Sequence, residues 1–142
     1  MIGRGTSVGA GLALALALAG SAAAEPSLTR MFTGPDGLSH LEPAPMPAGL
    51  FKTAGVQFLR AKAGVAAAPG TLDWHAEPRR RYVVTLSGRA IIETSGGDRF
   101  TADPEHVLLA EDLTGKGHRY LARPDGPQDW VLMLVEEPIL AN

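Results

Sequence analysis

The sequence predicts an all-β fold, a sandwich or barrel made of short strands. Short runs rich in valine, isoleucine, leucine and aromatic residues recur along the chain, and clusters of glycine, proline and aspartate separate them. Beyond residue 24, no segment has the sustained periodicity of an amphipathic helix. Short strands at turn-punctuated spacing are typical of sandwiches and barrels. No internal repeat or second domain is evident, so we expect a single domain.

The first 24 residues have the form of a secretory signal peptide, so they are set apart from the fold. Arg4 gives a positive start, Ala10 to Ala19 is an apolar stretch, and Ala22-Ala23-Ala24 forms a small-residue cleavage site before Glu25. The apolar stretch is shorter than the roughly 20 residues that a membrane-spanning helix needs. We therefore expect a periplasmic or secreted protein without a membrane anchor once residues 1–24 are removed.

Residues 25–50 are expected to contribute an N-terminal strand followed by an irregular strap. Leu28 to Thr33 is the predicted strand. The stretch EPAPMPAG at 42–49 is the predicted strap, because its prolines break a helix and cannot donate to a strand ladder.

Residues 51–142 are expected to form the β-barrel itself. Its predicted strands alternate apolar and polar residues or are rich in β-branched and aromatic ones, and turn residues such as Gly88 end them. The segment Ser95-Gly96-Gly97-Asp98 has the composition of a hairpin turn. The predicted strands lie at 55–62, 81–86, 90–93, 99–102, 107–110, 118–121 and 130–135. The small residues of 63–72 are expected to form a loop.

Composition excludes several function classes. Without Arg4, the chain has 12 Lys and Arg against 15 Asp and Glu, a net charge of about −3, so no concentrated basic surface for nucleic acid is expected. The absence of cysteine excludes disulfides, thiolate metal sites and cysteine nucleophiles. Any metal would therefore be held by histidine and carboxylate side chains.

Across roughly residues 51–136 the chain resembles the cupin superfamily of small jelly-roll barrels. The resemblance is carried by His75, by YVVTLSG at 82–88 and by Gly115-Lys116-Gly117-His118. The stretches DGLSH (36–40), GVQF (55–58), WHAEPRRRYVVTLSG (74–88) and LLAEDLTGKGH (108–118) are similar to a group of small single-domain bacterial cupin proteins. The resemblance implies a single cupin-type jelly-roll β-barrel, and it implies a homodimer, since dimers are common in this superfamily.

The metal-binding pattern of cupins can be placed on this chain by counting back from Gly88. Cupins usually bind a divalent metal through two histidines and a glutamate in a first motif and one histidine in a second. His75 and His118 match two of these positions. Glu77 stands where the second histidine is expected, and Arg81 stands where the glutamate is expected.

One interpretation is a metal site made of His75, Glu77 and His118. His75 and Glu77 are two residues apart, so on an extended segment they face the same way. Two imidazoles and a carboxylate suit non-haem iron and leave positions open for substrate and oxygen. The resemblance implies iron, manganese, nickel or zinc, with Asp112 as a further ligand or an orienting partner. This interpretation predicts an oxygenase or isomerase, although Arg81 would place a cation in the same pocket.

A second interpretation is a barrel mouth that binds a small polar or anionic molecule, with or without a metal. Arg79 and Arg81 share a face and would grip a carboxylate or phosphate through paired hydrogen bonds, while Arg80 points the other way. His75 and His118 would be hydrogen-bonding or acid–base groups. A third interpretation is a non-catalytic structural or partner-binding barrel. The two departures from the cupin pattern favour the second interpretation, and whether the protein is an enzyme stays open.

The remaining polar residues are assigned by strand alternation. Glu111 and Asp112 are adjacent and point to opposite faces, so we expect Asp112 to enter the site and Glu111 to meet an arginine. Trp74, next to the first histidine, is expected to face away from the site. His40 and His106 are expected in turns. The chain has no GxSxG stretch and no phosphate-binding glycine loop, which argues against a serine hydrolase or a nucleotide-binding P-loop protein.

Overall fold

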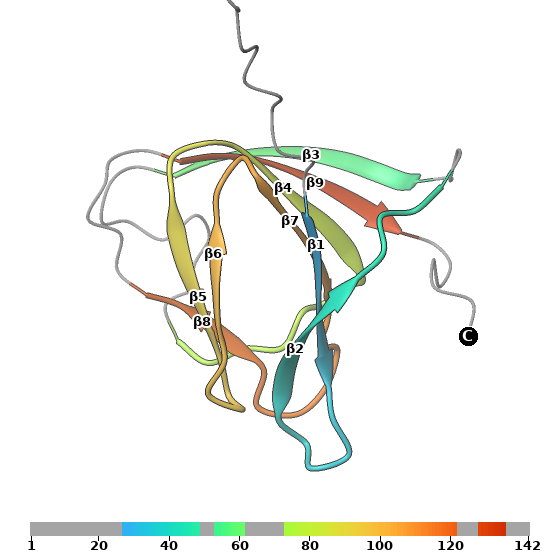
Figure 1. The fold of residues 1–142 in the computed structure, drawn as a ribbon, viewed down its shortest axis with the longest axis vertical. Helices are drawn as coiled ribbons and strands as arrows, with labels where there is room; N and C mark the ends of the chain where they lie inside the picture. The colour runs from blue at the N-terminus through green and yellow to red at the C-terminus, as the bar shows by residue number, and fades with distance from the viewer. Residues whose placement is uncertain (1–26, 49–52, 62–72, 122–127, 136–142) are drawn as a thin grey trace, which may run out of the picture.

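The computed structural model describes residues 27–48, 53–61, 73–121 and 128–135, and within these ranges the regular structure is β-strand (Figure 1). The expected signal peptide at 1–24 and the expected loop at 63–72 lie outside the described residues. The strands are β1 (Ser27–Thr33), β2 (Ser39–Ala44), β3 (Thr53–Ala61), β4 (Arg81–Ser87), β5 (Ala90–Thr94), β6 (Arg99–Ala102), β7 (His106–Glu111), β8 (His118–Tyr120) and β9 (Gln128–Val135). No described helix is long and apolar enough to cross a membrane.

The strands form two sheets that face each other, as Figure 1 shows. The larger sheet has the order β2-β1-β7-β4-β9-β3, and the smaller has the order β6-β5-β8. All pairs are antiparallel except β1 with β7, which run parallel. The all-β class expected from the sequence is confirmed.

A hydrophobic core lies between the two sheets because alternate residues of facing strands point inward. The larger sheet contributes Met31 and Trp130, and the smaller sheet contributes Ile92 and Phe100. A second apolar cluster, of Leu28, Tyr82 and Leu109, forms around neighbouring residues of β1, β4 and β7. Burial of Tyr82 raises the pKa of its phenol, and the nearby Glu111 charge raises this pKa further.

Each strand predicted from alternation is present, with ends that differ by a few residues. The expected irregular strap is wrong over its first part, because Ser39–Ala44 forms the strand β2, antiparallel to β1. Pro43, opposite Thr29, is tolerated there because β2 is the edge of its sheet and needs backbone hydrogen bonds on one side only. His40 accordingly lies in a strand, and its expected place in a turn is also wrong.

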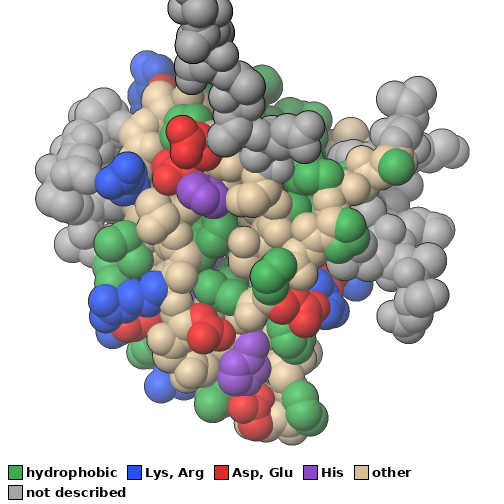
Figure 2. Space-filling view, in the orientation of Figure 1, with side chains coloured by type: hydrophobic (Ala, Val, Ile, Leu, Met, Phe, Trp, Pro, Cys, Tyr) green, Lys and Arg blue, Asp and Glu red, His purple; other side chains and the backbone are tan. Residues whose placement is uncertain are grey.

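The charged side chains on the face shown in Figure 2 are of mixed sign, with acidic and basic groups interspersed over the strands. Such a surface has no broad basic region of the kind that nucleic acids require.

Candidate functional site

The candidate site forms where the segment before β4 lies against the start of β8. His75 and His118 make a two-residue antiparallel bridge, in which each backbone N–H donates to the other's carbonyl oxygen at 2.9 Å. Gly117 permits this approach, because a Cβ there would lie 1.9 Å from the His75 carbonyl oxygen. The backbone N–H of Glu77 donates to the Asp112 carbonyl at 3.1 Å. The segment therefore brings both histidines and both carboxylate residues together.

The imidazole of His118 is fully buried and is oriented by a carboxylate. Its Nδ1 lies 2.8 Å from Oδ2 of Asp112, and Ser39 Oγ donates to the same oxygen at 2.8 Å. Because an ionised carboxylate only accepts hydrogen bonds, His118 donates through Nδ1, and Nε2 is the ring nitrogen left to meet a ligand. Among the described residues His118 Nε2 has no hydrogen-bond partner, and Glu77 Oε1 lies 3.6 Å from it.

The imidazole of His75 lies against that of His118, with ring centroids 4.4 Å apart. Its Nδ1 lies 2.9 Å from the backbone carbonyl oxygen of Asp73. A carbonyl oxygen accepts and does not donate, so His75 Nδ1 also carries its proton. Both histidines thus use Nδ1 to fix the ring, which leaves Nε2 as the remaining ring nitrogen, and metal-binding histidines are oriented in the same way.

Glu77 and Arg81 form an ion pair at the edge of this cluster. Arg81 Nη2 lies 2.8 and 2.6 Å from the two carboxylate oxygens of Glu77, whose side chain is only 1% exposed. Arg81 Nε is buried without a hydrogen-bond partner in the protein. Arg81 and Glu77, the two residues that depart from the cupin pattern, are therefore paired with each other. The Arg81 guanidinium neutralises the buried Glu77 carboxylate.

The two neighbouring arginines do not join this cluster. Arg79 is exposed, whereas Arg81 is paired with the buried Glu77, so the shared grip of Arg79 and Arg81 on an anion stays a prediction. Arg80 points the other way, as predicted, and its Nε donates to Glu111 Oε2 at 2.7 Å. Glu111 also meets Arg30. The prediction that Glu111 meets an arginine while Asp112 enters the cluster is therefore confirmed.

The predicted metal ligands are neighbours but do not form a three-ligand site in this conformation. Among the described residues, no group of three His, Cys, Asp or Glu side chains is arranged to hold a metal ion. Glu77 is turned toward Arg81, which leaves the two imidazoles as the available donors. The chemistry of His75 and His118 fits a site in which two Nε2 atoms are the protein ligands, and the buried Nε2 of His118 without a partner supports that fit.

Sequence reasoning missed Ser39, which is fully buried and hydrogen-bonded to Asp112. The available signal was the alternation of DGLSH, but the prolines that follow suggested a strap. Trp74 lies between Lys116 and Arg119, whose charged ends are each 4.6 Å from its ring centroid. His106 pairs with Asp103 at 2.6 Å and opens β7, outside the candidate site.

No protein-family model matches the chain, and no curated protein or solved structure matches it either.

Proposed function

We propose that this is an exported cupin-type jelly-roll barrel that binds a small polar or anionic molecule, together with a divalent metal ion, at His75 and His118. The observation that carries the proposal is the pairing of two imidazoles whose Nδ1 atoms are both engaged, which leaves both Nε2 atoms to meet a ligand. The signal-like residues 1–24 support export, and the sequence resemblance supports the barrel and a homodimer.

Unpaired polar atoms in the cluster support a ligand. Three atoms are buried and have no hydrogen-bond partner within the described part of the chain: His118 Nε2, Asp112 Oδ1 and Arg81 Nε. Leaving one such group unsatisfied costs about 1–3 kcal/mol, so native proteins rarely tolerate several side by side. A ligand that offers both a coordination centre and polar atoms would satisfy this set.

The charges of the cluster favour an anionic ligand once a metal is present. Glu77 and Asp112 carry formal negative charges, and Arg81 carries a positive one. A divalent ion bound to the two histidines would leave the cluster with a net positive charge. When bound, such an ion supplies a Lewis-acidic centre. The chain supplies the carboxylate Asp112, which orients the His118 ring, and the cation Arg81, which would favour an anion in this position.

The alternative is a metal-dependent enzyme, an oxygenase or isomerase that uses His75, Glu77 and His118. The observation in its favour is the 3.6 Å separation between Glu77 Oε1 and His118 Nε2, which places a carboxylate close to the imidazole donor. This alternative requires Glu77 to exchange its pairing with Arg81 for a metal, and it predicts that substrate is consumed. Simple binding predicts saturation without turnover.

The deciding experiment is elemental analysis of the full chain, purified without an affinity tag and compared with His75→Ala and His118→Ala. We expect about one equivalent of iron, manganese, nickel or zinc in the wild type and a loss in both variants. His106→Ala is the matched control, because His106 pairs with Asp103 outside the cluster and should keep the metal. Two results together would rule out the proposal. The wild-type protein would stay metal-free after reconstitution, and no anion would raise its melting temperature in a thermal-shift screen.

A further inference from the structure

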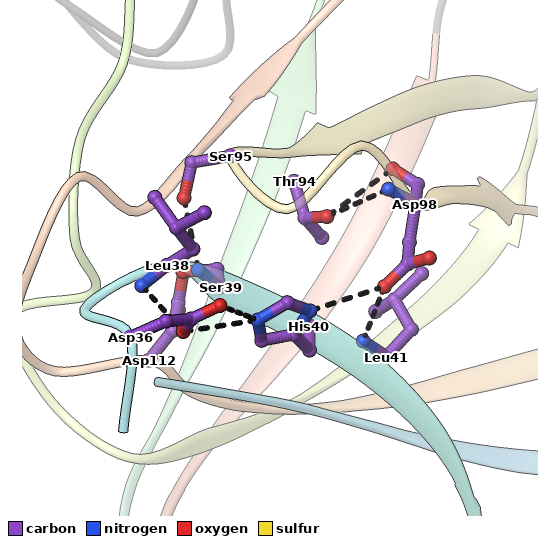
Figure 3. Close-up of polar contacts among 9 residues, drawn as sticks. All are labelled: Asp36, Leu38, Ser39, His40, Leu41, Thr94, Ser95, Asp98 and Asp112. Carbon is purple, nitrogen blue, oxygen red and sulfur yellow. Dashed lines mark hydrogen bonds and ion pairs between the residues drawn. The ribbon is translucent and has the colours of Figure 1, made fainter. Parts of the chain in front are cut away.

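Two consecutive residues of β2, Ser39 and His40, point to opposite sides of the strand, and each contacts side chains from other elements (Figure 3). Ser39 points inward, is fully buried, and donates to Asp112 Oδ2. His40 points outward, with its side chain 31% exposed. Its Nε2 lies 2.8 Å from Asp36 Oδ2, and its Nδ1 lies 3.8 Å from Asp98 Oδ2. The ring of His40 therefore stands between the β1–β2 turn and the β5–β6 hairpin.

The ring of His40 fits a slot between two glycines. A Cβ at Gly34 would lie 2.8 Å from the ring Cδ2, and a Cβ at Gly96 would lie 2.6 Å from Cε1 and Nδ1. The ring thus packs on the backbone of both turns while the carboxylates of Asp36 and Asp98 face its two nitrogens. Since the β1–β2 turn belongs to the larger sheet and the hairpin to the smaller, one side chain links the sheets at this end.

The same hairpin also holds the backbone of Ser39. Ser95 Oγ accepts from the Ser39 N–H at 2.9 Å, and the Gly96 N–H donates to the Ser39 carbonyl at 3.0 Å. Asp98 Oδ2 accepts from the Leu41 N–H at 3.0 Å (Figure 3). The position of the hairpin relative to β2 therefore sets the position of the Ser39 hydroxyl.

A continuous chain of contacts leads from this slot to the candidate site. The hairpin fixes Ser39, the Ser39 hydroxyl donates to Asp112 Oδ2, and the same oxygen accepts from His118 Nδ1. Because the three groups share one oxygen atom, a shift of Ser39 changes the hydrogen bond that orients the buried imidazole.

We propose that His40 is a positioning residue for the candidate site, acting through Ser39 and Asp112 on the orientation of His118. The inference rests on the proposed function, since it assigns His40 a part in holding the imidazole that would bind. Removing the ring takes away the side chain packed between the two turns, so only the hydrogen bonds of the hairpin to Ser39 and Leu41 still hold it against β2. The Ser39–Asp112–His118 chain then loosens although none of its own atoms has been changed.

The test follows the Nδ1 proton of His118 by nuclear magnetic resonance in the metal-free full chain. In the wild type we expect a slowly exchanging proton, because the ring is fully buried. His40→Ala should speed its exchange with solvent about tenfold. Zn²⁺ alone, titrated against a coloured chelator, should bind the variant about tenfold more weakly, the size of effect typical of groups that orient metal ligands.

His106→Ala is the control, because it also removes a histidine paired with an aspartate but has no link to Ser39. It should leave the exchange rate and the Zn²⁺ affinity unchanged. An exchange rate in His40→Ala within about twofold of the wild type would overturn the inference. If the exchange responds but Zn²⁺ binds to no form of the protein, the positioning role stands and the proposed metal site fails.

A second variant covers the case in which His40→Ala does not fold, as judged by circular dichroism. Asp36→Asn keeps the shape of the side chain but removes the charge that lies 2.8 Å from His40 Nε2, and the backbone group that Asp36 holds is Leu38 N–H, not Ser39. We expect the His118 Nδ1 proton to exchange about threefold faster in this variant. An unchanged exchange rate would then count against the inference.

Discussion

Two groups of charged residues in this molecule differ in burial and in how completely they are paired. On the outside, Glu93 pairs with Arg99 and Arg119, and Asp129 pairs with Arg60. Between the sheets, the cluster around His118 contains several buried polar atoms that no group in the described ranges satisfies. The exposed groups could be satisfied by water without any partner, whereas the buried ones could not.

This difference indicates which part of the molecule has polar atoms available to hydrogen-bond or coordinate a ligand. Exposed ion pairs contribute little to stability. That each of these exposed charges has a partner therefore shows only that oppositely charged side chains can reach each other there. Unsatisfied buried polar groups are costly, and where they persist they call for a ligand, an ordered water or a functional role. The incomplete cluster is therefore the part of the molecule in which binding best explains the residues present.

The largest effect is expected from breaking the buried ion pair. Glu77→Ala leaves the Arg81 guanidinium without its partner and should lower the free energy of unfolding by about 3 kcal/mol, measured by urea denaturation. The double variant Glu77→Leu, Arg81→Met should recover most of this loss, because apolar residues replace both charges. A double variant as unstable as the single one would contradict the interpretation of the pair.

Two serines that both donate to an aspartate allow a matched comparison of the two regions. Ser39→Ala removes a buried donor to Asp112 and should cost about 1 kcal/mol in urea denaturation. Ser87→Ala removes an exposed donor to Asp129 and should leave stability unchanged. Equal effects in the two variants would show that burial does not separate the regions.

Tyr82 is expected to give a smaller, pH-dependent effect. Burial raises the pKa of its phenol above the ordinary value, so the folded state keeps the proton more firmly than the unfolded state does. The resulting stability is fully present below about pH 10 and is lost as the pH rises through the folded pKa. Tyr82→Phe should remove this alkaline loss, and denaturation curves at increasing pH would show it.

The smallest effect is expected from the exposed pair of Arg60 and Asp129. Hydrogen bonds from Arg60 and then from Ser87 lower the pKa of the Asp129 carboxyl. Its contribution to stability is therefore present above the unfolded pKa of about 4 and is lost as the pH falls through the folded pKa. Asp129→Asn should differ slightly from the wild type at neutral pH, and the difference should vanish in strong acid or in about 1 M salt.

Much of the fold followed from local patterns in the sequence. Alternation located β3, and β-branched and aromatic residues located β4. Strand β2 was missed because the prolines of 42–49 outweighed its short alternating stretch, and only the structure shows that it is an edge strand. Local patterns do not specify which strands become neighbours. They therefore could not reveal that Pro43 lies in an edge strand, where a proline does little harm.

Most members of the candidate site were predictable, but Ser39 and several of the contacts were not. The alternation of side chains along a strand placed Glu111 and Asp112 on opposite sides, and in the structure Glu111, the last residue of β7, meets Arg80 while Asp112, just after it, meets His118. This alternation predicts which way a side chain points but not which group it meets. It therefore could not show that Glu77 neutralises Arg81, or that a serine far away in the sequence supports Asp112.

The parallel pairing of β1 with β7 has a consequence for the order in which the chain can fold. Ser27 lies opposite His106 in this pairing, so the first described strand waits for a partner that is synthesised much later. Chains dominated by such distant pairings fold in milliseconds to seconds, more slowly than helical bundles. During that interval one side of β1 is an open edge that another chain could occupy. We therefore expect folding yield to fall with protein concentration more steeply than equilibrium stability alone would predict.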